Sequence, residues 1–234
     1  MLDGRRRSAA AEVAYPDRLV EERPKLRAVP ELRQSGIYER LFKPVLDRAA
    51  GISLSIVTLP ILMVVVPLIW LTMGFPAVFK QRRIGRHGKE FTVYKLRTMR
   101  HDRRMNQAGY TGTDRRVNHK SSDDPRHTRL GRFLRKWSID EIPQLWNVAL
   151  GDMSLIGPRP ELPQLVARYA DWQHERHDTR PGMTGLWQVT ARGDIPMNEA
   201  SDIDVEYVRN LTFVGDLRII LLTVPAMLGL RQGA

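Results

Sequence analysis

The chain has 234 residues, enough to bury a substantial core as one large domain or two small ones. It contains no cysteine, which excludes disulfides and thiolate metal sites and favours a reducing cytosolic setting. The formal net charge is +11. The segment from Lys80 to Lys136 holds 18 basic and 5 acidic residues, so it alone carries +13. Such a basic segment favours an anionic partner such as nucleic acid, acidic lipid or a phosphorylated substrate.

The chain begins with a polar arm and continues into an apolar segment. Residues 1–36 contain scattered proline and arginine and lack the apolar core of a signal peptide, so we expect a loosely ordered arm. No residue from Ala49 to Phe79 carries a charge. Because about 20 apolar residues suffice to cross a bilayer, this length favours membrane insertion over a buried core helix.

Two features predict that this segment is re-entrant. Pro60 and Pro67 lie inside it, and an internal proline removes a helix hydrogen bond and kinks the axis, so Pro60 is the expected break of the membrane helix. Both flanks are basic, and lysine or arginine beside a membrane segment favours the cytoplasmic side. A broken helix that enters and leaves by the cytoplasmic face satisfies both observations, and a single span is the alternative.

The next segments predict a small catalytic domain. Phe91–Met99 alternates apolar and polar residues, which predicts a strand with Lys95 and Arg97 on one face. Residues 101–128 are polar and predict a loop. Further elements are expected as follows: helical structure over Leu130–Leu150 with an interruption at Trp137–Pro143, a rigid turn at Gly157–Pro160, and a helix over Leu162–Arg176.

The C-terminal part completes the predicted architecture. Arg180–Arg192 has the pattern of a loop that leads into a short strand, and Leu217–Leu230 is apolar but too short to span, so it suits an interfacial helix or, equally, a core helix. The expected fold is α/β and mainly helical, with a re-entrant membrane helix and a compact cytosolic domain with interfacial amphipathic helices. The expected parts are the arm (1–36), the membrane region (37–79) and the catalytic domain (80–234).

Asp140 and Glu141 are the candidate centre of the chemistry. Ser138-Ile-Asp-Glu141 has the spacing of a capping box, which places both acids in the first turn of a helix, and in an arbitrary protein helix capping is the commoner role for such acids. Neighbouring helix positions point about 100° apart, so the two carboxylates cannot face each other across a glycosidic bond. They could divide roles, with one carboxylate attacking phosphorus while the other holds Mg²⁺.

Basic residues near this pair could hold phosphate groups. Arg can bridge two phosphate oxygens in a planar fork, and a proline on each side limits the backbone of Arg159. Each of these residues taken singly is more often a solvated surface charge. The candidates are Lys95, Arg97, Arg135, Arg159 and Arg192. Among the six histidines, His174 and His177 are three apart but show no third metal ligand.

These motifs together resemble the bacterial sugar transferase family, the monotopic polyprenyl-phosphate phosphoglycosyl transferases, in the short form without extra N-terminal spanning helices. The resemblance runs from about Phe42 to Leu228 and includes the Leu59-Pro60 pair within the apolar segment. The remaining motifs are Gln81–Gly85, Tyr94–Met99, Asp124–Lys136, Ser138–Val148, Asp152–Glu161 and Arg180–Val189.

The resemblance implies a two-step reaction with a covalent intermediate. Asp140 matches the family's nucleophile, which takes a sugar-1-phosphate from a UDP-sugar and releases UMP, and Glu141 matches the neighbouring acid associated with Mg²⁺. Polyprenyl phosphate then accepts the phosphosugar, which starts assembly of a glycan such as an exopolysaccharide. Lys95, Arg135, Arg159 and Arg192 match basic positions that line the family's active site.

The implied partners are a UDP-sugar, polyprenyl phosphate and membrane lipids, at the cytoplasmic face of a bacterial inner membrane. The sequence leaves open a homodimer. A second hypothesis is a membrane-tethered module that binds nucleic acid or anionic lipid through its basic block. That block lacks the interleaved aromatic residues of a stacking platform and any helix-turn-helix or RNA-binding signature, so no nucleic-acid partner is expected.

Overall fold

The computed structural model describes residues 36–100, 128–190 and 200–227. These residues belong to one compact unit, Ser35–Ala234. The predicted arm, nearly all of the predicted loop at 101–128, and Arg192 lie outside the described residues. The described residues are mainly helical with two small two-stranded sheets, which confirms the predicted composition of the α/β fold.

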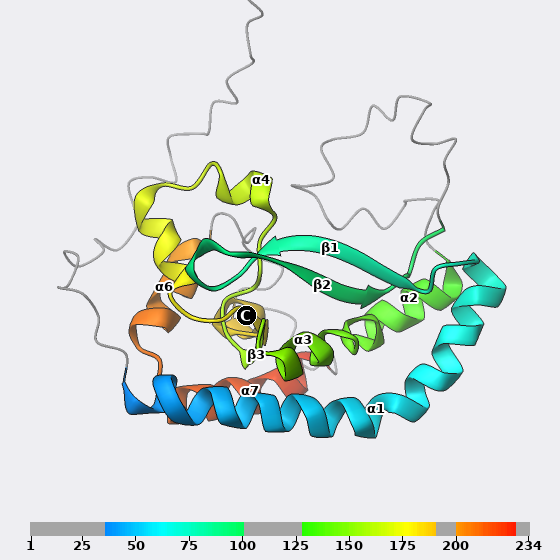
Figure 1. Ribbon diagram of the computed structural model, residues 1–234, viewed down its shortest axis with the longest axis horizontal. Helices are drawn as coiled ribbons and strands as arrows, with labels where there is room; N and C mark the ends of the chain where they lie inside the picture. The colour runs from blue at the N-terminus through cyan, green and yellow to red at the C-terminus, as the bar shows by residue number, and fades with distance from the viewer. Residues whose placement is uncertain (1–35, 101–127, 191–199, 228–234) are drawn as a thin grey trace, which may run out of the picture. The chain divides into compact units, whose positions relative to one another are not determined.

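A long helix, α1 (Lys43–Met73), follows a π-helical turn, η2 (Tyr38–Phe42). Pro60 and Pro67 both lie inside α1, and the helix bends before its C-terminal end (Figure 1), as internal prolines cause. The continuous helix Tyr38–Met73 is long and apolar enough to cross a membrane, and only 11% of its most apolar window is buried. The uncharged segment is therefore a bent and mostly uncovered helix as far as Met73, and its last two residues, Val78 and Phe79, begin β1.

The first turns of α1 are attached to the rest of the protein by buried polar groups. Lys43 Nζ lies 2.6 Å from Asp216 Oδ2, and the Tyr38 hydroxyl donates to the same oxygen at 2.8 Å. Asp47, one turn after Lys43, accepts from the backbone N–H of Leu155 at 3.1 Å. The polar start of α1 thus packs against protein, whereas most of its apolar length is exposed.

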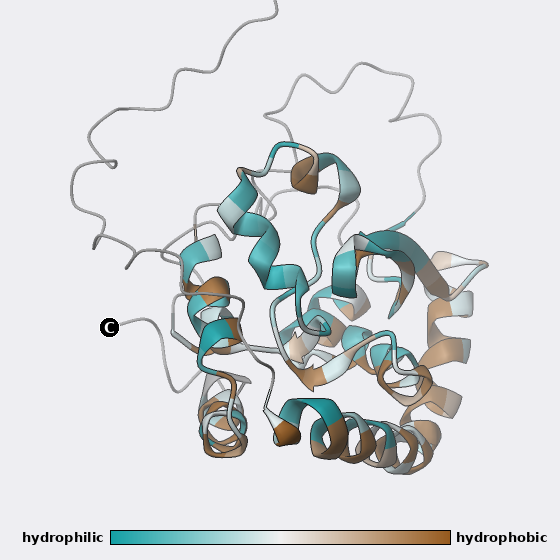
Figure 2. Ribbon diagram, turned by 60° about the vertical axis from the view of Figure 1, so that its left-hand side comes forward, coloured by the Kyte–Doolittle hydropathy of each residue, from teal (hydrophilic) through white to brown (hydrophobic). Residues whose placement is uncertain are grey.

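A second apolar helix, α7 (Phe213–Met227), lies on the same side of the molecule as α1. Figure 2 shows hydrophobic residues gathered in these two helices, in contrast to the hydrophilic segments on the opposite side. α7 exposes Phe213, Val214 and Leu221 while it buries Ile219. Its sequence left an interfacial helix and a core helix equally open, and the structure gives it one buried and one exposed face.

An antiparallel hairpin carries the strand predicted at Phe91–Met99. It consists of β1 (Val78–Ile84) and β2 (Glu90–Leu96), joined through the short turn η3 (Arg86–Gly88). Lys95 pairs with Phe79 across the hairpin. The hairpin packs on the end of α1, because Leu96 shares one buried cluster with Val65 and Ile69 of α1.

The predicted helical stretch with an interruption is confirmed. α2 (Arg129–Lys136) and α3 (Gln144–Leu150) are separated by a 3-10 turn, η4 (Ile139–Glu141). After α3, the strand β3 (Ser154–Ile156) pairs in parallel with β4 (Gly182–Thr184). The rigid turn predicted at Gly157–Pro160 follows β3 directly.

Two predictions downstream are wrong in part. The helix predicted over Leu162–Arg176 is divided into α4 (Pro163–Val166) and the 3-10 helix η5 (Asp171–His177). Ala170 between them is extended, and its N–H donates to the Gln173 side chain at 2.9 Å, a bond that caps the start of a new helix, so η5 begins here and α4 does not continue. The strand predicted within Arg180–Arg192 is β4, but it gives way to a helix, α5 (Leu186–Thr190).

The remaining described helix, α6 (Ser201–Arg209), contributes to the core that includes β3. Tyr207 and Val208 of α6 pack with Ile156, Val189 and Ile219, so β3, α5, α6 and α7 share one cluster. The Tyr207 hydroxyl also donates to Asp216 Oδ1 at 2.7 Å. This packing supports the turn that leaves β3, and that turn carries Arg159.

Candidate active site

The turn η4 presents Asp140 and Glu141 without the predicted capping box. Ser138 has φ 53° and ψ 21°, and its side chain makes no capping hydrogen bond, so the capping-box prediction is wrong. The backbone N–H of Glu141 instead donates to the Ser138 carbonyl at 3.1 Å. The 3-10 turn ends at Glu141, and Pro143 is the N-cap of α3. A non-glycine residue in the left-handed region is uncommon and marks local strain next to the two acids.

Two cations flank Glu141. Lys95 Nζ of β2 lies 2.7 Å from Glu141 Oε1, and Arg159 Nη1 lies 4.0 Å from the same oxygen. These side chains keep between 23% and 31% of their surface exposed, so the cluster remains open to a ligand. Three of the residues predicted from sequence, Lys95, Glu141 and Arg159, therefore meet in one place although they come from separate segments.

Asn147 holds the two segments that carry Lys95 and Glu141 in register. It is fully buried on α3, accepts from the N–H of Tyr94 at 3.2 Å and donates to the carbonyl of Thr92 at 2.7 Å. The Asn147 side chain thus forms hydrogen bonds with the backbone N–H and C=O groups on either side of Val93, at the unpaired edge of β2. These bonds connect β2 to α3. Because η4 directly precedes α3, they also set the position of Glu141 relative to Lys95.

Asp140 is more deeply placed than Glu141, with 9% of its surface exposed. Burial raises the pKa of Asp140 to about 6, and the charge of Glu141 acts in the same direction. The charges of Lys95 and Arg135 oppose this rise. A carboxylate with a pKa of about 6 is more basic than an ordinary one yet about nine-tenths ionised at pH 7, which suits a nucleophile.

The other predicted basic residues have different surroundings. Arg135, on α2, is close enough to Asp140 for its charge to lower the pKa of that carboxyl. Arg97 donates to the carbonyls of Met73, Gly74 and Phe75 and so closes the C-terminal end of α1. Phosphate binding by Arg97 stays a prediction, as does that by Arg192 outside the described residues.

Sequence reasoning missed Arg83 and Glu161 as members of this site. Arg83 Nη1 lies 3.9 Å from Glu161 Oε2, and burial together with the charge of Arg159 lowers the pKa of Arg83 to about 10. Glu161 is only 2% exposed, and burial raises its pKa against the opposing charges of Arg176 and Arg83. Their place in the motifs Gln81–Gly85 and Asp152–Glu161 was the available signal, but burial cannot be read from a motif.

The two acids fit a hard divalent cation. The charge of Glu141 raises the pKa of Asp140, so the two carboxylates are near enough to repel each other, and a cation would relieve that repulsion. Mg²⁺ binds through one or two carboxylates together with substrate phosphate oxygens and needs no larger protein cage. Among the described residues no group of three His, Asp or Glu side chains gathers as a metal site.

Comparison with known proteins places this arrangement in a family. The sequence profile described as bacterial sugar transferase matches residues 38–229, most of the chain. The chain belongs to the bacterial sugar transferase family. The match includes η4, the hairpin and the Gly157–Pro160 turn, so every described residue of the site lies within it.

Several members of the bacterial sugar transferase family are similar in sequence to this chain. The uncharacterized sugar transferase EpsL of Bacillus subtilis is 42% identical over 192 residues, which cover 82% of this chain and 88% of EpsL. The undecaprenyl-phosphate galactose phosphotransferase of Salmonella typhimurium is 37% identical over 83% of this chain but only 42% of its own length. The UDP-glucose:undecaprenyl-phosphate glucose-1-phosphate transferase of Xanthomonas campestris is 34% identical over 86% of this chain and 42% of its own length. The chain thus spans less than half of the last two relatives.

Proposed function

We propose that the protein transfers a hexose-1-phosphate from a UDP-sugar to polyprenyl phosphate and so starts the assembly of a glycan on a lipid carrier. The observation that carries this proposal is the buried Asp140 carboxylate beside Glu141, Lys95 and Arg159 in a bacterial sugar transferase chain. The Salmonella and Xanthomonas relatives are named for transfer to undecaprenyl phosphate, and their named sugars are galactose and glucose. These names support a hexose as the transferred sugar.

The proposed reaction has two displacements at one phosphorus. In the first, an Asp140 carboxylate oxygen bonds to the sugar-bearing phosphorus while the bond from this phosphorus to the bridging oxygen breaks, and UMP leaves with that oxygen. In the second, an oxygen of polyprenyl phosphate attacks the same phosphorus. The bond to Asp140 then breaks, which restores the carboxylate and yields a polyprenyl diphosphosugar. A carboxylate is an established acceptor of phosphoryl groups in enzymes.

Basic side chains of this chain would neutralise the charge of the substrate phosphates. Lys95 and Arg159 already lie against Glu141, and Arg159 can present a planar fork to two phosphate oxygens. The charges of Lys95 and Arg135 favour the ionised form of Asp140, against the effect of its burial. When bound by Glu141 and Asp140, Mg²⁺ would neutralise the diphosphate and its leaving group.

Membrane attachment through α1 completes the proposal. The lipid acceptor requires a site at a membrane surface, and α1 offers a long apolar surface that the described residues leave mostly uncovered. Basic residues flank it on both sides, which favours entry and exit at the cytoplasmic face. The bend of α1 and its internal Pro60 support a re-entrant helix over a single span.

The first test measures UMP release by the purified full-length protein in detergent. We expect sustained release from UDP-galactose or UDP-glucose only when polyprenyl phosphate and Mg²⁺ are both present. Without the lipid, at most about one equivalent of UMP per enzyme should appear, because the covalent intermediate has no acceptor. Sustained release without the lipid would show hydrolysis and contradict transfer, and a panel of UDP-sugars identifies the donor.

The pH dependence of this reaction follows from Asp140. Attack requires the ionised carboxylate, so kcat/KM for the UDP-sugar should fall about tenfold per pH unit below a midpoint near 6 and stay level from pH 7 to 8. Bound Mg²⁺ favours the ionised form and can only move that midpoint lower. The check is kcat/KM from pH 5 to 8, with the unfolding midpoint recorded at each pH as the control. A rate that still rises between pH 7 and 8 would contradict this assignment.

A further inference from the structure

The turn that carries Arg159 receives a hydrogen bond at each of four consecutive carbonyls. The Pro158 carbonyl accepts from Gly182 N at 2.9 Å and the Glu161 carbonyl from Ile84 N at 2.9 Å. The two carbonyls between them accept from arginine side chains: Arg159 O from Arg176 Nη2 at 3.0 Å, and Pro160 O from Arg83 Nη1 at 3.1 Å.

This pattern follows from the composition of the turn. Pro158 and Pro160 have no backbone N–H, so they cannot donate hydrogen bonds within the turn, and their rings fix φ. The groups that donate to the four carbonyls come instead from β4, β1 and η5, which are distant in sequence. Residues outside the turn therefore fix its geometry, and the two arginine side chains bind its two central carbonyls.

Arg176 makes its bond to the turn from a buried position. It is 1% exposed and also donates to the carboxylate of Asp204, which is fully buried on α6, and to the hydroxyl of Tyr169. Removing an ion pair from water is energetically costly, and apolar side chains of similar size often stabilise a fold as well or better. Stability alone therefore accounts poorly for an arginine at this place.

We propose that Arg176, held by Asp204, is a positioning residue for Arg159. By fixing the Arg159 carbonyl it sets the direction in which the Arg159 side chain leaves the turn, toward Glu141 at 4.0 Å and the phosphate of the bound substrate. This inference rests on the proposed function, since it assumes that Arg159 meets a phosphate. Arg83 supports the same turn through the next carbonyl.

The planar guanidinium is required for this role. Its five donors in a rigid fork allow Arg176 to reach Asp204, Tyr169 and the Arg159 carbonyl at once, whereas lysine offers one flexible ammonium. Arg176→Lys keeps the buried charge but loses the simultaneous bonds. A displacement of a substrate-binding group by about 1 Å can cost about 100-fold in rate, so we expect kcat/KM to fall roughly 10-fold to 100-fold.

A double-mutant cycle separates positioning from a general structural effect. UMP release is measured for wild type, Arg176→Lys, Arg159→Ala and the double variant. If Arg176 acts through Arg159, then Arg176→Lys has almost no further effect once Arg159 is Ala. An equal fold-loss in both backgrounds would overturn the proposal. A second cycle uses Asp204→Asn in place of Arg176→Lys. UMP release should fall in the wild-type background and change little in the Arg159→Ala background.

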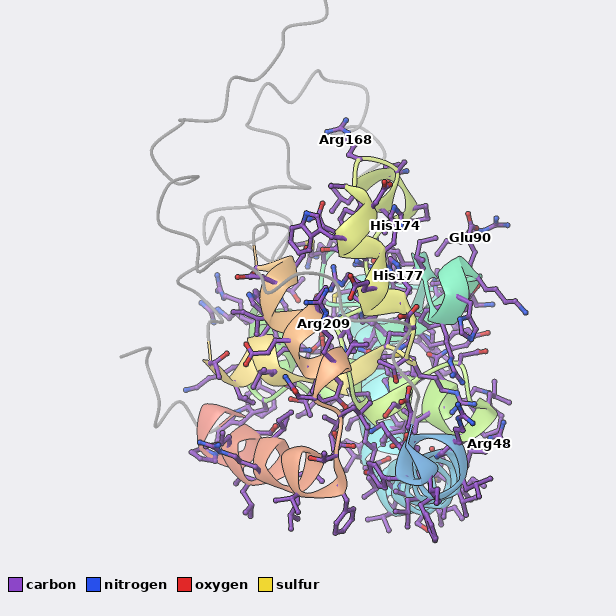
Figure 3. All side chains as sticks on the ribbon, turned by 90° about the vertical axis from the view of Figure 1, so that its left-hand side faces the viewer. Arg48, Glu90, Arg168, His174, His177 and Arg209 are labelled. Carbon is purple, nitrogen blue, oxygen red and sulfur yellow. The ribbon has the colours of Figure 1, made fainter. Side chains whose placement is uncertain are left out.

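Arg209→Lys is the matched control. Arg209 of α6 also joins η5, through bonds of 2.9 and 2.8 Å to Glu175, and Figure 3 shows it beside the helix that carries His174 and His177. Its side chain has no bond to the turn among the described contacts, so we expect UMP release within about twofold of wild type.

A second readout keeps this inference separate from the proposed function. Backbone hydrogen exchange of a peptide covering residues 154–162 should rise in Arg176→Lys and not in Arg209→Lys, whatever reaction the protein catalyses. Unchanged exchange in Arg176→Lys would overturn the positioning role. A wild-type protein that releases no UMP, combined with raised exchange in Arg176→Lys, would instead refute the proposed reaction and leave the anchoring of the turn established.

Discussion

Asp140→Asn is expected to lower sustained UMP release by at least about 1000-fold, because the amide cannot attack phosphorus to form the covalent intermediate. The substitution nearly preserves the shape of a side chain that is 9% exposed, so the fold should survive it. The measurement is UMP release with the lipid acceptor and Mg²⁺ present. Intact-protein mass without the acceptor should show one added phosphosugar on wild type and none on Asp140→Asn.

Asp171→Asn serves as the control for this experiment. Asp171 is an exposed acid at the start of η5, so its replacement removes the same charge from the chain without touching the site. It should retain wild-type turnover. If Asp140→Asn also retains it, the covalent mechanism is wrong, and the two acids serve only to hold the turn or a cation.

Gly182→Ala should strongly reduce the stability of the fold. A Cβ at Gly182 would lie 2.1 Å from the backbone nitrogen of Gly157 and 2.4 Å from the carbonyl oxygen of Thr184. Neither atom can rotate away as a side chain does, so the paired strands β3 and β4 would have to separate. We expect a loss of about 3 kcal/mol or more. The unfolding midpoint in detergent should then fall by roughly 10 °C.

Gly36→Ala provides the comparison, since nothing lies within 4 Å of a Cβ at Gly36. It should change the unfolding midpoint by less than about 2 °C. Gly182→Ala should also reduce UMP release in the surviving folded protein, because the strand that it displaces donates to the Pro158 carbonyl of the turn that carries Arg159. A folded Gly182→Ala variant with wild-type stability would contradict this close packing of β3 against β4.

The elements between Leu130 and Leu150 were predictable, whereas the helices downstream were predicted only in part. Periodicity over Leu130–Leu150 and the proline near its middle predicted α2, a break and α3, because these signals are local in sequence. β3 has three residues, too few for an alternation to be visible, and β4 was predicted as a short strand without a partner. Their pairing depends on backbone packing between Gly157 and Gly182, a contact between distant segments that composition cannot reveal.

The same distinction applies to the site: residues in local motifs were predicted, and buried supporting residues were not. Family motifs supplied Asp140, Glu141, Lys95 and Arg159, and the structure places them together or next to one another. The capping box failed because spacing cannot reveal that Ser138 adopts a left-handed backbone conformation. Asn147 and Arg176 went unnoticed because their importance comes from what they contact when buried, and an isolated Asn or Arg in a sequence is ordinarily a surface residue.

The contact between α1 and α3 bears on where the reaction takes place relative to the bilayer. A Cβ at Gly51 of α1 would lie 2.7 Å from the backbone nitrogen of Ala149, so the two helices touch backbone to backbone with almost no space to slide. With α1 seated in the lipid as proposed, α3 and the acids just before it stay at one constant height above the hydrocarbon. The phosphate of the long lipid carrier must then rise to that height, because the protein cannot lower its carboxylates to reach it.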